Sequence, residues 1–395
     1  MPIRRQYASH LIVAFLLLPT LLWLSSWASA PATGSPEKST PDLIQEAVDA
    51  GHLDRHTAEQ YLTYALTDPS QLPAEYHSTQ AWDGTLALLS LTADAGTAVA
   101  DLPPHRQAIQ DALTSGSCGP MNAVLPHVYT TPHFFIEYDT IGGGLTIEEY
   151  AAVLETTYTT LIHDYGWAAP PTNDALNGRY PVRVEALGMG LYGFMSDRGD
   201  YAGFVGDNPS TPWPEKYAYK SCIVLHQDYS GFLSPPEAVL RSTVAHEFTH
   251  AVQHGYGALR NHDLQADMAF VEGTATLMED EIFDNANDNY HYLWPEFDSC
   301  MGQYGGEPVS AWLVFRGLIE RFGTAVAGGG EDVIQQVWET SGQATSLNNL
   351  QALSEAFDNK GVNLTEAYHD YAIAARFTKA CGAGYPAPYC FEEGA

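Results

Sequence analysis

Three short segments carry the hydrophobic pattern of β-strands. They are rich in β-branched and aromatic residues, and they read HFFIEYD (133–139), PVRVEAL (181–187) and SCIVLHQ (221–227). A helical period follows the first of them, at residues 148–166, directly behind the capping box Thr146-Ile147-Glu148-Glu149. These elements predict a small α+β unit in the middle of the chain.

The pattern before residue 120 is helical. Apolar residues recur at helix spacing in three segments: 42–51, 56–68 and 105–116. Thr40 followed by Pro41 is typical of a helix start, because a cap residue precedes a first-turn proline. The segment SCGPMNAVLP (117–126) interrupts the pattern and predicts a boundary near residue 120.

From Ser234 onward the pattern is again helical. Ser234-Pro235-Pro236-Glu237 combines a cap residue, first-turn prolines and a glutamate three positions on. Six helical stretches are predicted, at 237–256, 265–283, 308–322, 331–340, 348–358 and 364–378. We therefore expect an α+β fold in which a small sheet precedes a mostly helical half and follows a helical N-terminal segment.

The first 30 residues have the pattern of a secretory signal peptide. Arg4 and Arg5 begin it, an apolar run starts at Leu11, and the small residues Ala28-Ser29-Ala30 offer a cleavage site. A membrane anchor is the alternative, because the apolar run is not far short of a spanning length. The proline at position 19 and the cleavage site favour export, so we expect an extracellular or periplasmic protein without a stable membrane anchor.

Composition and cysteine usage agree with this picture. The chain has 48 acidic and 17 basic residues and a formal net charge of −31, which repels phosphate backbones and argues against nucleic acid as a partner. None of the five cysteines forms a CxxC zinc pattern, and pairing is expected in an exported protein. Cys381 and Cys390 bracket a short loop that their pairing would close.

The stretch AHEFTHAVQHGYG (245–257) carries the candidate chemistry. His246 and His250 are four residues apart, so they share one helix face and can bind one zinc ion together. Glu247, next to the first histidine, is placed to accept a proton from a zinc-activated water. His254 lies about 12 Å from His246 along a helix axis. We therefore expect it to be a polar neighbour on the helix surface and not a ligand.

A third ligand is predicted downstream, in AFVEGTATLMEDEIFD (269–284). Glu272 lies 22 residues after His250, which leaves room for a loop and an antiparallel return helix. Gly273 and Ala275 leave space for a close approach of the two helices. Glu279, seven positions after Glu272, is expected to orient a ligand through a hydrogen bond. A solvated acidic face is the alternative for these glutamates.

The motif His246-Glu247-Phe248-Thr249-His250, followed by Glu272-Gly273-Thr274-Ala275, resembles the gluzincin zinc peptidases, the clan of thermolysin and the zinc aminopeptidases. Longer stretches, HEFTHAVQHGYG, FVEGTATLMEDEIFD and YLTYALTDPSQLPAEY, resemble a family of secreted bacterial proteins assigned as metalloproteases. The resemblance runs from about residue 42 to 378. It implies a zincin-like domain over 121–380, with His246, His250 and Glu272 as zinc ligands and Glu247 as general base.

The chain departs from these families at two points. Thr276 stands where thermolysin has an aspartate, which leaves the orienting partner of His246 open. The Gly-x-Met-Glu-Asn signature of the aminopeptidases is absent, so an endopeptidase is the expected class.

Two further features concern catalysis and metal binding. A peptidase needs a donor for the oxyanion, and the candidates are Tyr290, His291, Tyr292 and Tyr304, of which Tyr304 precedes two glycines. The acidic run 280–290 contains oxygen ligands of the type that calcium uses, at Asp280, Asp284, Asn287 and Asp288. The spacing is not that of an EF-hand, so a solvated turn at the end of a helix is the favoured interpretation and calcium binding is the alternative.

The predicted function is hydrolysis of protein or peptide substrates by a secreted zinc-dependent peptidase. One alternative is a catalytically inactive, zinc-stabilised surface or binding protein, and another is a zinc hydrolase for other substrates, such as cell-wall peptides. Residues 31–120 supply none of the predicted ligands and form either a propeptide or a permanent helical domain. Residues 381–395 are expected to form a C-terminal tail, and the pattern leaves the oligomeric state open.

Overall fold

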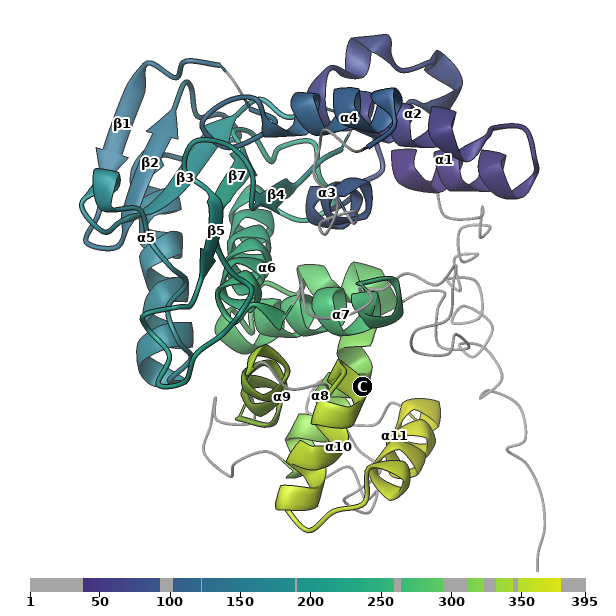
Figure 1. The fold of residues 1–395 in the computed structure, drawn as a ribbon, viewed down its shortest axis with the longest axis vertical. Coiled ribbons are helices and arrows are strands. Elements are labelled where there is room, and N and C mark those ends of the chain that lie inside the picture. The colour runs from purple at the N-terminus through teal and green to yellow at the C-terminus, as the bar shows by residue number, and fades with distance from the viewer. Residues whose placement is uncertain are drawn as a thin grey trace, which may run out of the picture. The chain divides into compact units, whose positions relative to one another are not determined.

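A computed structural model describes residues 38–92, 102–121, 123–188, 190–258, 264–293, 311–322, 332–343 and 347–377 (Figure 1). Contacts divide the chain into two units, Met1–Lys38 and Ser39–Ala395. Of the first unit only Lys38 is described, so the predicted signal peptide lies outside the described residues. The same holds for the predicted Cys381–Cys390 pair and for the tail 381–395.

A five-stranded sheet lies at the centre of the second unit, with the strand order β1-β2-β3-β7-β4. Its strands are β1 (His127–Thr130), β2 (Phe134–Tyr138), β3 (Tyr180–Glu185), β7 (Cys222–His226) and β4 (Gly193–Ser196). β2, β3 and β7 are parallel, and they are the three strands that the sequence predicts. The edge strands β1 and β4 are antiparallel to their neighbours. They were not predicted, because four residues are too few for a clear alternation.

A separate antiparallel ribbon is formed by β5 (Gly203–Gly206) and β6 (Ala218–Lys220). The helices of the described residues are α1 (Thr40–Asp49), α2 (Arg55–Thr67), α3 (Gly84–Thr92), α4 (Pro104–Thr114), α5 (Ile147–Tyr158), α6 (Pro236–Gly255), α7 (Leu264–Ile282), α8 (Trp312–Phe322), α9 (Asp332–Gly342), α10 (Asn349–Asn359) and α11 (Leu364–Phe377). The fold is therefore mixed α and β, in agreement with the predicted α+β class. No helix in the described part of the chain has both the length and the apolar composition that crossing a membrane requires.

The predicted helix starts are confirmed in part. Thr146 caps α5, and the carboxylate of Glu149 accepts a hydrogen bond from the Thr146 backbone N–H, which completes the capping box. At α1 the cap is Ser39 and not Thr40, so the prediction is wrong by one residue.

The capping box predicted at Ser234 is wrong. α6 begins at Pro236, and the residue in the cap position is Pro235, which has no side chain able to form a capping hydrogen bond. Ser234 lies one residue too early to cap the helix, and its hydroxyl lies 3.1 Å from Nε2 of His291 instead. The predicted first-turn proline of this helix is present.

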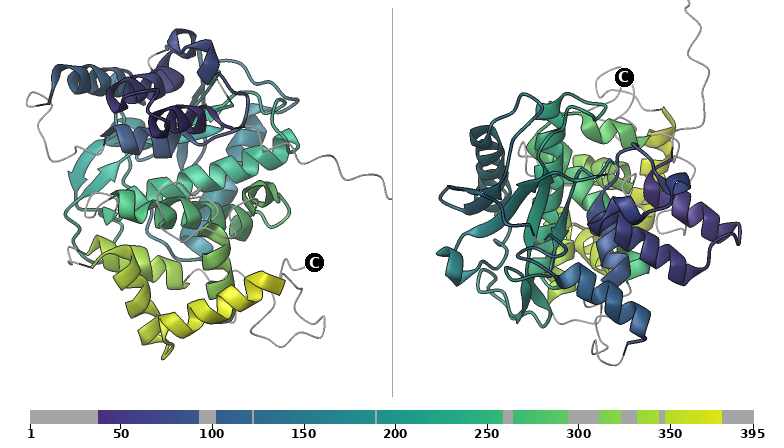
Figure 2. Two further views of the ribbon diagram at one scale, coloured as in Figure 1. Left: turned by 90° about the vertical axis from the view of Figure 1, so that its right-hand side faces the viewer. Right: turned by 90° about the horizontal axis from the view of Figure 1, so that it is seen from above.

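Side chains alternate along β7, and the two sets enter different hydrophobic cores. Ile223 and Leu225 join the core that contains α5 and α6, whereas Cys222 and Val224 join a second core with α1–α4. Figures 1 and 2 show α1–α4 beside the β4 end of the sheet. The N-terminal helices therefore cover part of one sheet face. They share a core with strands of the α+β unit, across the boundary that the sequence predicts near residue 120.

A disulfide bond between Cys118 and Cys222 joins this N-terminal segment to β7. Removal of the bridge by the double change Cys118→Ala and Cys222→Ala should lower the free energy of unfolding by about 3 kcal/mol, because the bridge restricts the unfolded chain. It spans 104 residues of sequence. Urea unfolding followed by circular dichroism measures the effect. Equal midpoints for the oxidised wild type and the double variant would contradict the expectation, and reduced wild type should resemble the variant.

Candidate metal centre

α6 and α7 bring three of the predicted site residues together. His246 and His250 lie one turn apart on α6, and their Nε2 atoms are 3.2 and 3.5 Å from Oε2 of Glu272 on α7. All three side chains are buried. Their ligand atoms and that of Asp83 lie within 4.8 Å of one another, so this group could hold a metal ion.

Gly273 does not have the neighbour that the sequence analysis expected. A Cβ atom on Gly273 would lie 2.8 Å from Cβ of Ala311 and 2.9 Å from Cε2 of Phe315. The glycine therefore makes room for the segment that contains α8, and not for α6. Successive residues of a helix point in directions about 100° apart, so a residue next to Glu272 faces away from the metal group.

Hydrogen bonds orient both imidazole rings. Nδ1 of His246 is 2.8 Å from Oε1 of Glu279, and Nδ1 of His250 is 2.9 Å from Oε1 of Gln253. The Gln253 amide nitrogen donates to the backbone oxygen of Val271, which turns its oxygen toward the histidine. With an oxygen acceptor at each Nδ1, that atom carries a proton, and Nε2 is the nitrogen directed at the shared centre. The predicted contact of Glu279 is confirmed, whereas the role of Gln253 was not predicted.

The polar atoms at the centre fit a bound cation. Glu247 Oε1, His250 Nε2 and Glu272 Oε1 are buried and have no hydrogen-bond partner among the described residues. Buried polar atoms are normally paired, and buried carboxylates require a compensating charge. A divalent metal ion would pair with these polar atoms and would compensate the carboxylate charge. Imidazole nitrogens and carboxylate oxygens are ligands that zinc binds.

The two central glutamates differ in their protonation. Burial raises the pKa of Glu247 well above its usual range, and the neighbouring carboxylate of Asp83 adds to this effect. Burial also acts to raise the pKa of Glu272, but His250 and His246 outweigh it and hold that pKa at about 2. Glu272 therefore has the charge that a metal ligand needs. Glu247 has the higher proton affinity that suits a base.

A residue of the N-terminal segment contacts the predicted base. The hydroxyl of Thr85, in the first turn of α3, donates a hydrogen bond to Oε2 of Glu247 at 2.8 Å. The same hydroxyl accepts a hydrogen bond from the backbone N–H of Met195 on β4, also at 2.8 Å. Thr85 is completely buried, so this contact is part of the interior.

Asp83 is the member of the metal group that sequence reasoning missed. We expected no ligand from residues 31–120, but Oδ2 of Asp83 lies 3.7 Å from Nε2 of His246. Its Oδ1 accepts hydrogen bonds from the backbone N–H groups of Thr85 and Leu86, at 2.6 and 3.3 Å. In the sequence, an aspartate just before a helix is typical of an ordinary N-cap. Only the contact of Asp83 with His246 on α6, which is distant in sequence, identifies it as a candidate ligand.

The remaining predicted site residues have other positions. His254 is buried beside the ring of Tyr219, so its predicted place on the surface is wrong, because α6 is buried along most of its length. Tyr304 and the side chain of Tyr292 lie outside the described residues. Tyr290 stacks on Trp312, and Nε2 of His291 lies 3.1 Å from the hydroxyl of Ser234. A small cavity beside the ligands is lined by a different tyrosine, Tyr192.

The acidic turn after α7 makes other contacts than those expected of a calcium site. Oδ2 of Asp280 is 3.4 Å from Nη2 of Arg316, and Oδ1 is 3.3 Å from Nδ2 of Asn289. Asp284 is exposed, whereas Asp288 is buried. Within the described residues, the three aspartates of this turn do not gather into a group of metal ligands.

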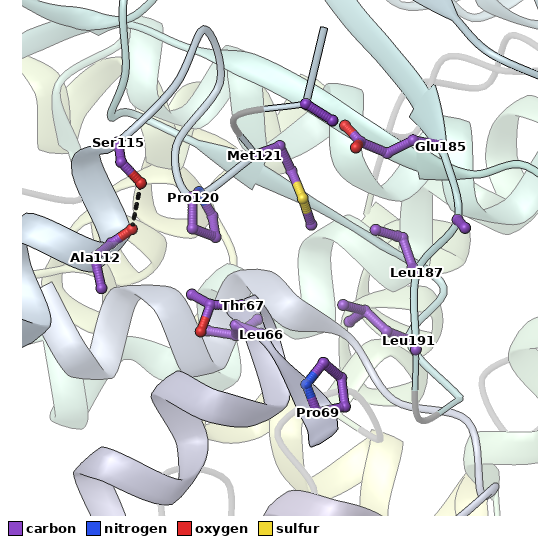
Figure 3. A pocket seen from close by; sticks show the side chains of 13 residues that line it. Leu66, Thr67, Pro69, Ala112, Ser115, Pro120, Met121, Glu185, Leu187 and Leu191 are labelled. Atoms are coloured by element: carbon purple, nitrogen blue, oxygen red, sulfur yellow. Dashed lines mark hydrogen bonds between the residues drawn. The ribbon is translucent and has the colours of Figure 1, made fainter. Parts of the chain in front are cut away.

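A larger cavity, of about 440 Å³, lies away from the metal group (Figure 3). Its walls come from α2, α4 and the chain after β3, and its lining includes Leu66, Pro69, Met121, Leu187 and Leu191. Glu185 is the charged residue in this lining, and it pairs with Arg183. The larger of these two cavities is therefore not the one that lies beside the metal group.

No protein-family model matches this chain, and no curated protein sequence matches it.

Proposed function

We propose that this protein is a secreted zinc-dependent peptidase of gluzincin type, with a zincin-like catalytic domain. The observation that carries the proposal is the convergence of His246, His250 and Glu272, with Glu247 beside the ligands. Three such ligands leave a fourth position for water, which is the arrangement of catalytic zinc sites. The Cys118–Cys222 disulfide fits export, because such bonds persist in oxidising compartments.

Zinc bound at this group would lower the pKa of a water molecule and polarise the carbonyl of a peptide bond. Glu247 would accept the proton of the water and then pass it to the leaving amine. Its burial directly beside the ligand His246 supports this role. Glu279 and Gln253 would keep the imidazole lone pairs directed at the metal.

The second candidate is a zinc-stabilised binding protein, and one observation favours it. Asp83 supplies a fourth protein ligand, and a site closed by four protein ligands is typical of structural zinc. The buried Glu247 favours the peptidase, because a structural site has no use for an additional carboxylate next to its ligands. A zinc hydrolase of cell-wall peptides would use the same residues on another substrate.

We expect the purified chain to bind zinc, and we expect zinc-dependent hydrolysis of casein by the wild type or by a variant in which the fourth ligand position is open. The assay includes the variant Asp83→Ser, because the Asp83 carboxylate would compete with water for the metal. Treatment with 1,10-phenanthroline should stop hydrolysis, and added zinc should restore it. A peptidoglycan digest run in parallel distinguishes the cell-wall alternative. Zinc binding without hydrolysis of casein, in both wild type and variant, would contradict the peptidase function.

A further inference from the structure

We propose that residues 82–85 hold this protein in a latent state, in which Asp83 takes the fourth position on the metal and Thr85 engages the base Glu247. The inference rests on the proposed peptidase function. α3 contacts both β4 and α7, and Figure 1 shows it beside β4. The segment thus contacts both the sheet edge and the helix that carries Glu272.

The carboxylate of Asp83 is placed to exclude water from the metal. It belongs to the same group of ligand atoms as His246, His250 and Glu272, all within 4.8 Å of one another. Zinc with four protein ligands has a closed tetrahedral shell, whereas catalysis needs an open position. With Asp83 bound, the water that Glu247 would deprotonate has no place.

The second element of the latent state is the hydrogen bond from Thr85 to Glu247. It engages Oε2, one of the two oxygens that would accept a proton during hydrolysis. The backbone N–H of Met195 fixes the Thr85 hydroxyl from the other side, so its proton points at the glutamate.

The third element is the edge of the sheet. β4 is an edge strand, and an edge strand offers backbone groups with which an extended peptide can pair. In the chain leading into β4, Trp82 N–H donates to the Gly190 oxygen and Tyr192 N–H donates to the Trp82 oxygen, both at 3.1 Å. A peptide substrate paired with residues 190–192 at this edge would require the groups that Trp82 already uses.

Gly84 allows the segment to approach the sheet this closely. A Cβ atom at this position would lie 2.9 Å from Cδ1 of Leu191, 3.0 Å from Cβ of Phe194 and 3.2 Å from the Gly193 backbone oxygen. A larger residue would therefore push the segment away from β4 without changing any metal ligand.

Capping of α3 is another explanation for the position of Asp83. The two roles use different oxygens of the Asp83 carboxylate. Oδ1 caps the helix, and Oδ2 faces His246. The variant Asp83→Ser keeps a side chain that caps well but removes the carboxylate from the metal. Asp111→Ala, at an exposed aspartate on α4, is the matched control in the same segment.

The test uses the full chain loaded with Co²⁺, whose absorption spectrum reports the ligands of the metal, together with acetohydroxamate, a small metal-binding inhibitor. The wild type and Asp111→Ala should show little spectral change when acetohydroxamate is added. Asp83→Ser should bind it at least tenfold more tightly and, with zinc, hydrolyse casein at least tenfold faster. Gly84→Val, which retains every ligand, should change in the same direction.

Two results would overturn the latent state. One is equal acetohydroxamate binding and equal hydrolysis in the wild type and both variants. The other is loss of the metal from Asp83→Ser, which would make Asp83 a permanent structural ligand. The proposed function fails separately: a variant that gains acetohydroxamate binding but hydrolyses no casein supports the blocked position and contradicts the peptidase. If Asp83→Ser does not fold, the Co²⁺ spectra of Gly84→Val with and without acetohydroxamate test the latent state by themselves.

Discussion

The variant Glu247→Gln should lose casein hydrolysis by about a thousandfold or more, because general base catalysis contributes effects of this size. The amide cannot accept a proton, but it has nearly the shape of the carboxylate and can still accept the hydrogen bond from Thr85. The zinc content should therefore remain that of the parent. The change is made in the wild type and also in the Asp83→Ser background, where the expected activity is higher and the loss easier to measure.

An exposed glutamate provides the control for this variant. Glu148 lies in the first turn of α5, away from the metal group, and Glu148→Gln should leave hydrolysis unchanged. Hydrolysis by Glu247→Gln at the rate of its parent would remove Glu247 from the role of base and refute the proposed mechanism. Loss of zinc from the variant would instead assign the glutamate a part in metal binding.

Glu272→Ala should weaken zinc binding far more than Glu279→Ala. The first change removes a side chain whose oxygen lies 3.2 Å from one imidazole nitrogen and 3.5 Å from the other. The second removes only the contact that orients His246, and loss of such a contact typically costs about 10- to 100-fold in metal affinity. Competition with a chromogenic zinc chelator measures both affinities.

The matched control for these two variants is Glu355→Ala, at an exposed position on α10. Its zinc affinity should equal that of the wild type. Unchanged zinc affinity in Glu272→Ala would place the third ligand elsewhere. A larger loss in Glu279→Ala than in Glu272→Ala would exchange the roles of the two glutamates.

Elements with a clear period could be predicted from the sequence. The three parallel strands and the helices after Ser234 combine regular apolar spacing with adequate length, so the pattern locates each of them. α3 was missed because its sequence, GTLALLSLT, is apolar on all sides and lacks a helical period. The antiparallel edge strand β4 was missed because it is short. The contact surface between β4 and α3 was therefore missed as well.

The residues of the candidate site also differ in whether a local sequence pattern predicts them. His246, Glu247 and His250 follow from local spacing on one helix, and Glu272 follows from the return of the next helix. Asp83 and Thr85 reach the site through contacts distant in sequence, and no local pattern encodes such contacts. No role was predicted for Gln253, so its hydrogen bond to His250 was overlooked.

The N-terminal helices bear on the predicted choice between a propeptide and a permanent domain. Their core contains Val224 of β7 and Phe194 of β4, so loss of the whole segment would expose apolar residues of the sheet. Displacement of residues 82–85 alone would open the metal site and leave α1, α2 and α4 in place. The latent state therefore does not require that residues 31–120 be removed.

The Cys118–Cys222 bridge has a consequence for a nicked form of this protein. A cut after Cys118 and before Cys222 would leave the two fragments covalently joined through the Cys118–Cys222 bond to β7. The fragment carrying Asp83 would then stay near the metal at an effective concentration on the order of millimolar. A cut between α3 and Cys118 would leave both cysteines on the other fragment, so the fragment carrying Asp83 would depend on its packing alone. A thiol reductant would remove the tether in the first form and change nothing in the second, so the two cleavage positions should differ in their response to reduction.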